Sequence, residues 1–443
     1  MKEIFRKVLP LSLIVALRFF GLFIVLSVLS QYALGLPGGT AFLAGVAVGG
    51  YALTQAVLQV PFGVLSDRIG RKKTLLVGLL IFAVGSAVAA SADTIWVLLL
   101  GRFLQGAGAI GSVVTAMIAD QVREDERAHA MAVMGMTIAM SFAAAMIIGP
   151  IVGGLWSVSA LFWLTAVLAL AALAILFTAV PEPPKIVHSY TEEEAKIKHV
   201  FKDKDLVRMY ITFLFHSSTM AIAFFLIPIV MKQKFGMGPQ EYWKIYLPAV
   251  IFGIVAMGPA AVFGEKYGKG KEVFLASIAF IAVSFALMGW SSSVLWFGVG
   301  ATFFFIGFNM FEPLLQSFVS KFAKVHQKGA ALGVANTFAY VGIFMGGAVG
   351  GWLYQTWGEA GVAILVIAVC FFWALWIFTM RSPSVRENLF LPYAEYDKSK
   401  MDGLKMVNGV TDFYMNETEE IIVVKFDNEV VDAETIKTFL ARR

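Results

Sequence analysis

Residues 63–73 read Gly-Val-Leu-Ser-Asp-Arg-Ile-Gly-Arg-Lys-Lys, and this charged segment separates two long apolar runs. One run covers residues 41–66 and the other covers residues 74–91. Runs of this kind match the roughly 20 apolar residues that a helix needs to cross a bilayer. The segment is therefore expected to connect two membrane-spanning helices.

The composition of the chain is that of a membrane protein. Of 443 residues, 59% are hydrophobic and 15% are charged, and the mean hydropathy is +0.78. Soluble domains carry about a quarter charged residues, so a water-soluble fold is excluded. One cysteine, Cys370, rules out a disulfide framework, and we expect it to be inert packing. The net charge of +5 is attributed to basic loops at anionic lipid, and no nucleic-acid partner is expected.

The apolar runs predict an all-α polytopic membrane protein with twelve spanning helices. The first run is too long for a cleavable signal peptide and lacks a small-residue cleavage site, so it is expected to be a span. The expected helices cover residues 9–34, 41–66, 74–91, 94–120, 128–154, 157–180, 207–231, 242–265, 273–290, 293–320, 328–355 and 359–380.

Lys and Arg concentrate on one side of this expected bundle. The N-terminus and the connections after the second, fourth, eighth and tenth spans are basic, whereas most opposite connections have little charge. The connection after the seventh span is the exception, with Lys232, Lys234 and Lys244. Basic loops face the cytoplasm. We therefore expect a multi-pass protein of the cell inner membrane with both termini in the cytoplasm.

A polar stretch divides the spans into two halves. We expect an N-terminal six-helix half at 1–180, a cytoplasmic linker at 181–206 and a C-terminal six-helix half at 207–381. In the linker, Thr191 and Glu194 form a capping box that would begin an amphipathic helix on the membrane surface. A purely solvated linker is the alternative.

The two halves carry traces of a repeat. The sequence Asp-Arg-Ile-Gly-Arg-Lys at 67–72 has a weaker copy, Glu-Lys-Tyr-Gly-Lys-Gly, at 265–270. Both copies follow the second span of their half. Duplicated halves with a substrate site between them are typical of secondary transporters.

The last part of the chain, residues 388–443, is short, charged and mixed in pattern. We expect strands and helices in the order βαββα, a small α+β ferredoxin-like domain that lacks its last strand. The expected elements are strands at 389–393, 411–415 and 421–427, a helix at 397–406 and a helix from Asp432. The tail resembles heavy-metal-associated domains, which bind metal through Cys-x-x-Cys. It has no cysteine, so no metal site or cofactor is expected.

Residues 63–73 match the signature G-x-L-x-D-R-x-G-R-K-x throughout, so the chain resembles transporters of the major facilitator superfamily. That resemblance implies a twelve-helix fold and a latch for the outward-open state. In the latch, Asp67 would meet the N-terminus of the eleventh helix and Arg71 would pair with Asp120 at the end of the fourth. Anchoring by basic residues would explain the cations but not Asp67. The expected latch residues are Gly63, Asp67, Arg68, Gly70, Arg71 and Asp120.

Two further segments carry the resemblance. Residues 102–106, Arg-Phe-Leu-Gln-Gly, match the motif R-x-x-Q-G, and an arginine inside a span is a functional candidate by default. Snorkelling of Arg102 to the outer interface is the alternative. Gly149, Pro150, Gly153 and Gly154 match the core of a signature associated with antiporters, although Ala145 stands where a further glycine is expected. Close helix packing is the alternative reading of these glycines.

Three more ionisable side chains lie within the expected spans. They are Arg18 in the first, His216 in the seventh and Glu312 in the tenth. Glutamate among apolar residues is favoured in its neutral form, and histidine titrates near neutral pH. We therefore name Glu312, His216, Arg102 and Arg18 as the proton-coupling residues. His216 could instead be a satisfied interior imidazole, whereas Asn309 and Pro313 beside Glu312 suggest the wall of a polar cavity.

Together with the tail, these motifs resemble the YajR-type bacterial drug/proton antiporters, with a departure at Ser27, where proline is common. The resemblance implies proton-coupled export of a small hydrophobic or cationic compound by a monomer. A membrane sensor with a ligand-responsive tail and proton-coupled nutrient uptake are the alternatives. No nucleophile–base motif or phosphate loop is present, so an enzyme is not expected.

Overall fold

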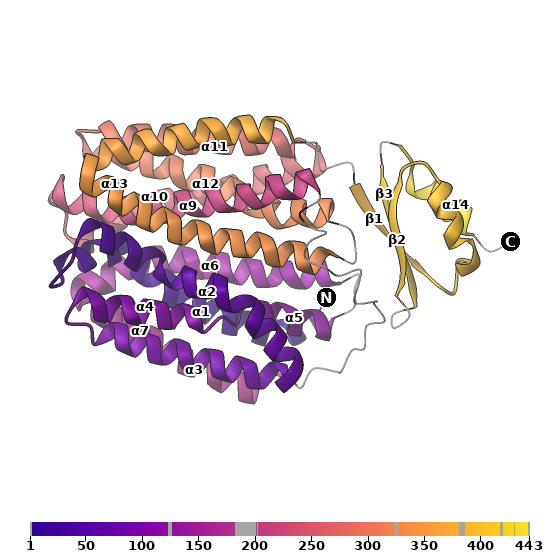
Figure 1. The fold of residues 1–443 in the computed structure, drawn as a ribbon, viewed down its shortest axis with the longest axis horizontal. Coiled ribbons are helices and arrows are strands. Elements are labelled where there is room, and N and C mark those ends of the chain that lie inside the picture. Colours follow the sequence, from indigo (N-terminus) through magenta and orange to yellow (C-terminus); the bar gives the residue numbers. More distant parts are fainter. Residues whose placement is uncertain are drawn as a thin grey trace.

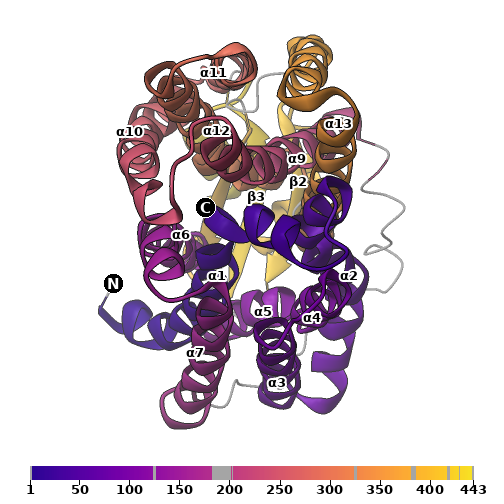
Figure 2. The ribbon, with the colours of Figure 1, turned by 90° about the vertical axis from the view of Figure 1, so that its left-hand side faces the viewer.

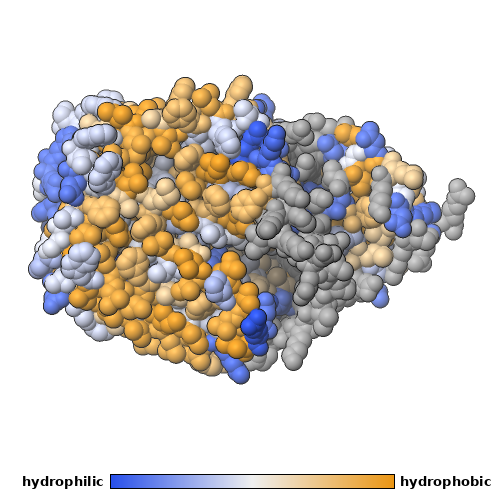
Figure 3. Space-filling model, in the orientation of Figure 1, coloured by the Kyte–Doolittle hydropathy of each residue, from blue (hydrophilic) through white to orange (hydrophobic). Residues whose placement is uncertain are grey.

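The computed structural model describes residues 2–122, 126–181, 201, 203–323, 327–380, 386–416, 420–428 and 430–441. A bundle of long helices carries a small sheet domain at one end (Figure 1). We call the sheet domain the tail domain, the end of the bundle beside it the tail end, and the opposite end the far end. The side of the bundle is mainly hydrophobic, and hydrophilic residues gather at the two ends (Figure 3).

The first half contains seven helices that make six passes. The fourth pass consists of two helices, α4 and α5, separated at residues 108–110. The helices are α1 (Lys2–Gly35), α2 (Ala41–Ile69), α3 (Arg71–Ala90), α4 (Ile95–Ala107), α5 (Gly111–Gln121), α6 (Arg127–Leu155) and α7 (Val158–Thr178). The expected linker helix that would begin at Thr191 lies outside the described residues.

The second half completes the bundle. Its elements are α9 (Lys204–Gln233), η1 (Pro239–Glu241), α10 (Trp243–Ala261), η2 (Val262–Lys266), α11 (Gly270–Trp290), α12 (Val294–Phe322) and α13 (Lys328–Phe378). Among the described residues, eleven helices are long and apolar enough to cross a membrane, and one of them covers 50 residues from Gly329 to Phe378. At 1.5 Å per residue a straight helix of that length would span about 75 Å, far more than a bilayer core.

That long helix makes two passes. Gly358 has φ 65° and ψ −163° and breaks α13. A positive φ of this kind is open mainly to glycine. The break lies between the two spans expected at 328–355 and 359–380, so the twelve-pass architecture predicted from the sequence is confirmed.

The two halves meet closely at the far end, where α1 and α2 lie beside α9 and α13 (Figure 2). A Cβ atom at Gly45 of α2 would lie 2.0 Å from the carbonyl oxygen of Gly347 on α13. A Cβ atom at Gly49 would lie 2.6 Å from the carbonyl oxygen of Ile343. Only glycine fits at such distances, so small residues bring the two backbones together.

The tail domain is a three-stranded antiparallel sheet with one short α-helix and one 3₁₀ helix. Its strands follow the order β1-β3-β2, and Leu404, Ile436 and Leu440 are fully buried in its core. The elements are β1 (Arg386–Pro392), η5 (Lys398–Met406), β2 (Val410–Asn416), β3 (Ile421–Asp427) and α14 (Ala433–Leu440). This order agrees with the ferredoxin-like arrangement predicted without its last strand. The expected first helix is a 3₁₀ helix, and Asp432 is the N-cap of the last one.

The tail domain contacts the bundle at the end of α12. Lys425 of β3 is 2% exposed, and its Nζ donates to the carbonyl oxygens of Ser320 and Ala323. Carbonyl groups at the end of a helix have no partner within the helix and carry partial negative charge. A buried lysine ammonium is therefore well placed there, and it joins the tail domain to the second half.

Candidate functional site

The latch segment is a tight turn between α2 and α3. Gly70 ends α2 and begins α3 with φ 100°, a conformation that favours glycine. Gly63 lies inside α2, where a Cβ atom would make ordinary contact with Ser112. Of the two glycines, Gly70 is the one that the turn requires. Arg68 lies exposed in the last turn of α2, where a cation is favourable.

Arg71 connects three parts of this turn. Its Nε donates to Oδ2 of Asp120 at 3.0 Å, and its Nη1 donates to Oγ of Ser66 at 2.5 Å. Nη1 also lies 2.6 Å from Oδ1 of Asp67. Because Asp120 lies on α5, these bonds tie the turn between α2 and α3 to the end of the fourth pass. The structure thus brings together Asp67, Arg71 and Asp120, three of the four charged latch residues named from the sequence.

The latch does not extend to the second half in this conformation. The side chain of Asp67 is 63% exposed and pairs with Arg71 one turn later in the chain. Its expected contact with the N-terminus of α13 is not made among the described residues. The halves instead seal at the far end, so the structure is in the state opposite to the one for which that contact was expected.

The second half contains a charge-reversed counterpart of the latch. Glu265, in the weaker copy of the motif, accepts hydrogen bonds from Ser317 and from Nζ of Lys321 on α12. In the first half the cation lies in the turn and the acid ends the fourth pass. In the second half the acid lies in the turn and the cation ends the corresponding pass. In each half, therefore, an ion pair joins the turn after the second pass to the end of the fourth pass.

The glycines of the antiporter motif lie where α6 packs closely. A Cβ atom at Gly149 would lie 2.2 Å from the carbonyl oxygen of Ile24 on α1. A Cβ atom at Gly154 would lie 2.6 Å from the backbone nitrogen of Gln240 in η1, which belongs to the second half. Pro150 lies between them within α6. The motif thus joins α6 to both halves at the far end.

Arg102 is a fully bonded clamp between α4 and α2. Its Nε and Nη2 donate to the carbonyl oxygens of Ala47 and Val48 at 2.9 and 3.3 Å. Its Nη1 donates to Oε1 of Gln105 at 2.7 Å, and its Cζ lies 4.7 Å from the ring centroid of Tyr51. In this conformation the guanidinium holds helices together and does not snorkel to the interface.

Arg18 lies equally deep but is far less satisfied. Its Nη2 donates to Oε1 of Gln55 at 3.0 Å. Its Nε and Nη1 are buried and have no hydrogen-bond partner among the described residues. The two arginines of the first half, both named from the sequence, therefore differ sharply in their surroundings.

His216 is a packed interior imidazole. Its Nε2 donates to the carbonyl oxygen of Phe308 at 3.1 Å, and its ring stacks on Phe308 with 4.2 Å between centroids. A neutral ring that donates from Nε2 fits this geometry. The hydrogen-bond partner of His216 is thus a backbone carbonyl of α12, the helix that also carries Glu312.

Glu312 lies deep in the helix bundle, on α12, and has an exposed side chain. Both are true when a side chain lines an open interior space. One turn earlier, Nδ2 of Asn309 donates to the carbonyl oxygen of Phe305. This position makes Glu312 a candidate for a carboxyl group that lines a space inside the bundle.

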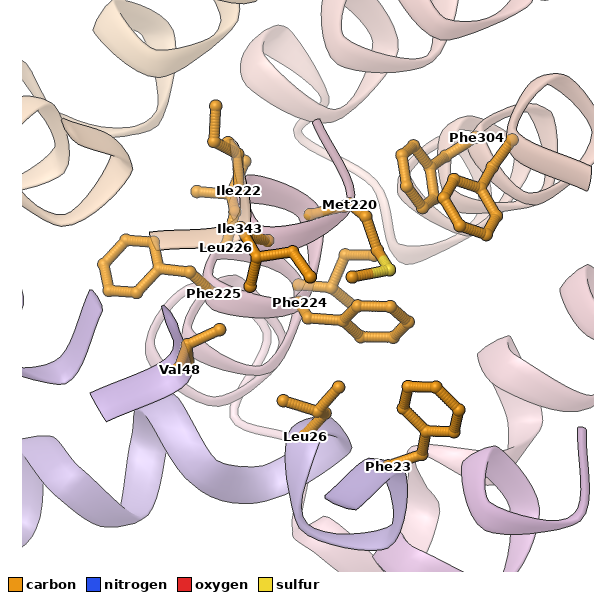
Figure 4. Close-up of a cluster of buried hydrophobic side chains, with 14 of the residues drawn as sticks. Phe23, Leu26, Val48, Met220, Ile222, Phe224, Phe225, Leu226, Phe304 and Ile343 are labelled. Atoms are coloured by element: carbon orange, nitrogen blue, oxygen red, sulfur yellow. The ribbon is translucent and has the colours of Figure 1, made fainter. Parts of the chain in front are cut away.

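Aromatic side chains from both halves meet beside this region. The ring of Phe142 on α6 lies 5.0 Å from Phe23 and 5.8 Å from Phe224, between centroids. It also lies 6.2 Å from Phe305 and 6.3 Å from Phe308. Figure 4 shows the apolar contact between halves, with Phe23 and Leu26 of α1 and Val48 of α2 opposite side chains of α9.

Three polar residues at the border between the halves were not among the predicted site residues. Gln55 and Gln59 are buried on α2, and Tyr340 on α13 lies close to Gln55 and Arg18. Two glutamines one turn apart within an apolar span could have been recognised in the sequence as polar site candidates, because an amide in lipid must find hydrogen-bond partners. Tyr340 carried no such signal, since tyrosine is common in membrane helices.

Comparison with known proteins gives a consistent result. The family model of the Major Facilitator Superfamily matches residues 11–346 and 249–407. The inner membrane transport protein YajR of Escherichia coli is 34% identical over 96% of this chain and 95% of its own length. The multidrug resistance protein MdtH of Proteus mirabilis is 26% identical over 78% of this chain and 85% of its own. A mutant form of the nucleoside transporter NupG has a similar fold, with 15% identity, a TM-score of 0.68 and coverage of 84% and 99%.

Proposed function

Because the chain belongs to the Major Facilitator Superfamily, we propose that it exports a small, largely apolar compound in exchange for protons by alternating access. That it is a multi-pass membrane transporter of a small molecule, and not an enzyme, follows from its family and its relatives. Proton coupling, export and the class of compound are the content of the proposal. We also propose that the tail end faces the cytoplasm, because basic loops lie at that end.

The position of Glu312 is the observation that supports proton coupling. A proton carrier must reach an interior space and change charge during the cycle. Glu312 lies deep within the bundle with an exposed side chain. An ionised carboxylate in apolar surroundings is costly, so loading and release of a proton would be coupled to opening and closing around it. His216 then acts as a packing partner of α12, and Arg102 as a clamp.

The aromatic side chains around Phe142 support an apolar compound. Rings from α1, α6, α9 and α12 gather there, and relatives include a protein named for multidrug resistance. Of the hydrophobic and cationic classes expected from the sequence, the hydrophobic one has more support. The buried guanidinium of Arg18 would repel a cation.

Gradient-driven flux in proteoliposomes tests this proposal. The probes are N-phenyl-1-naphthylamine, an apolar dye, and ethidium, a cationic one. We expect a pH gradient to drive transport of the apolar dye by the wild type, and Glu312→Gln to reduce that transport at least tenfold while retaining dye binding with a flatter pH dependence. Glu272→Gln, the same change at an exposed position on α11, is the control. A Glu312→Gln variant that concentrates dye at the wild-type rate would show that Glu312 is not the carrier.

A rival function has one structural observation in its favour. The tail domain contacts α12 through Lys425, and α12 carries Glu312. A sensor whose tail domain reports ligand occupancy would need such a connection. The flux assay separates the two, because a sensor binds dye without transporting it.

A further inference from the structure

Arg18 is a buried cation whose Nε and Nη1 atoms have no hydrogen-bond partner among the described residues. Its side chain on α1 is 1% exposed, and among the described residues only Nη2 has a hydrogen-bond partner, Gln55. Guanidinium groups stay charged in proteins and offer five N–H donors. Leaving such donors unpaired in a dry interior costs free energy. The described residues therefore leave a binding capacity that they do not themselves use.

No acidic side chain that the structure describes compensates this charge. In the first half, Asp67 and Asp120 are engaged with Arg71 at the tail end, and the rings of Phe19 and Phe82 lie 5.7 and 5.2 Å from the guanidinium carbon. Aromatic faces attract a cation weakly compared with an anion. Arg102 provides the contrast, because each of its three nitrogens has an acceptor. All three guanidinium nitrogens of Arg102 thus donate hydrogen bonds, whereas one nitrogen of Arg18 does so among the described residues.

The unpaired group lies at the border between the halves. Gln55, which accepts from Arg18, lies near Tyr340 of the second half, since a Cβ atom at Gly111 would lie 4.0 Å from Nε2 of Gln55 and 3.9 Å from the hydroxyl of Tyr340. A Cβ atom at Gly111 would lie 3.9 Å from both Oε1 of Gln59 and the hydroxyl of Tyr340, so α2, α5 and α13 meet there. Alternating access separates surfaces of this kind. Arg18 and its partner Gln55 therefore lie where the two halves move relative to each other.

A row of aromatic contacts connects the surroundings of Arg18 with the aromatic residues that support the proposed function. Phe19 stacks with Phe23 at 5.4 Å between centroids, and Phe23 meets Phe142 at 5.0 Å. A ligand that fits both ends has an aromatic body and one acidic group. Carboxylate and phosphate match the planar fork of arginine, whereas a neutral amide or an ammonium does not.

We propose that Arg18 binds the acidic group of the transported compound, so that the exported molecule is an apolar organic anion. The anion supplies the counter-charge that the first half lacks and engages the donors at Nε and Nη1. This inference rests on the proposed function and adds the charge of the substrate to it.

Equilibrium binding to the detergent-purified full-length chain tests the inference without any gradient. The probes are 1-naphthaleneacetate and its neutral amide, 1-naphthaleneacetamide, which share one ring system. We expect the wild type to bind the acid at least tenfold more tightly than the amide. Arg18→Gln should abolish this preference, and Arg18→Lys should retain part of it. Arg208→Gln, which removes an arginine paired with Asp205 outside this region, should leave the preference unchanged.

Two results would overturn the inference. One is a wild type that does not distinguish acid from amide, and the other is an Arg18→Gln variant that still does. Thermal unfolding of Arg18→Met adds a readout that needs no ligand. If Arg18 serves binding, removing an uncompensated charge should leave the melting temperature of the ligand-free protein unchanged or higher. A large fall would mark Arg18 as structural and contradict the inference. Intact proton-driven flux of the apolar dye beside a failed acid preference would leave the proposed function standing.

Discussion

Arg71 shows how one side chain can organise a membrane transporter at its surface. Its guanidinium bonds to Asp120, Ser66 and Asp67, and its own side chain is 18% exposed. A hydrogen bond to a charged group contributes about 1.5–3 kcal/mol, and this applies to the shielded pair with Asp120, whereas the pair with Asp67, which is 63% exposed, contributes less. These bonds tie the α2–α3 turn to α5, and the side chain of Asp67 is 63% exposed beside Arg71. We propose that Arg71 is the fixed part of the latch and that Asp67 changes partner during the cycle.

Substitutions in the latch should therefore affect transport and spare binding. We expect Arg71→Ala and Asp67→Asn each to lower the transport rate at least fivefold while ligand affinity changes less than threefold, because both residues lie at the tail end and away from Glu312 and Arg18. Lys73→Ala, in the same segment and exposed, is the control. Initial rates in proteoliposomes and equilibrium binding provide the two measurements. Wild-type rates in both variants would remove the latch assignment.

At the scale of elements, the sequence predicted the spans better than their contacts. Apolar length and basic loops placed twelve passes correctly, and even the break near Gly358 lay between two expected helices. Charged residues in a spanning helix could be recognised as functional candidates from the sequence, because a charge in lipid is costly. The different surroundings of Arg18 and Arg102 could not be predicted, because they depend on which backbone carbonyls and amides the neighbouring helices present. The latch residues depended on the motif, and the contact of Lys425 with α12 had no signal in the sequence.

The close approach of α2 and α13 gives a prediction at this scale. Gly347→Leu places a side chain where a Cβ atom would already lie 2.3 Å from the carbonyl oxygen of Gly45, so the far end should not close. Val48, 1% exposed in the apolar contact between halves, becomes the reporter through Val48→Cys. We expect maleimide to label it at least tenfold faster in the Gly347→Leu background. Gly333→Leu on the same helix, where a Cβ atom meets open space, should not change the rate. Equal labelling in both backgrounds would contradict the seal.

At the scale of the whole molecule, the tail domain is a separate unit with a point of attachment on α12. Its core contains its own buried residues, and Lys425 binds the last carbonyl groups of the helix that carries Glu312. A separate core means that the bundle does not need the tail domain in order to fold. The attachment means that the tail domain can favour one position of α12 over another.

Removing the tail domain, or its contact with α12, should therefore change the transport rate without unfolding the bundle. Deletion after Ser384 should preserve a monodisperse bundle and at least partial dye transport, because the deleted part contributes no span. Lys425→Met should change the dye transport rate, relative to that of the wild type, in the same direction as the deletion does. Lys437→Met, which breaks an exposed pair with Glu434 on α14, should have no effect. Complete loss of flux by a well-folded truncation would make the tail domain an obligatory part of the cycle.

The far-end seal also limits the energy of each turnover. One elementary charge crossing 100 mV provides about 2.3 kcal/mol, which equals the burial of roughly 90 Å² of apolar surface at about 25 cal/mol/Å². The contact of α1 and α2 with α9 and α13 is held by glycine backbones and apolar side chains (Figure 4), and one proton offsets the exposure of only about 90 Å² of such apolar surface. Transport at a useful rate therefore requires that the tail end gains a seal of nearly equal free energy as the far end opens. We propose that the charged turns at the tail end, where the side chain of Asp67 is exposed, provide it.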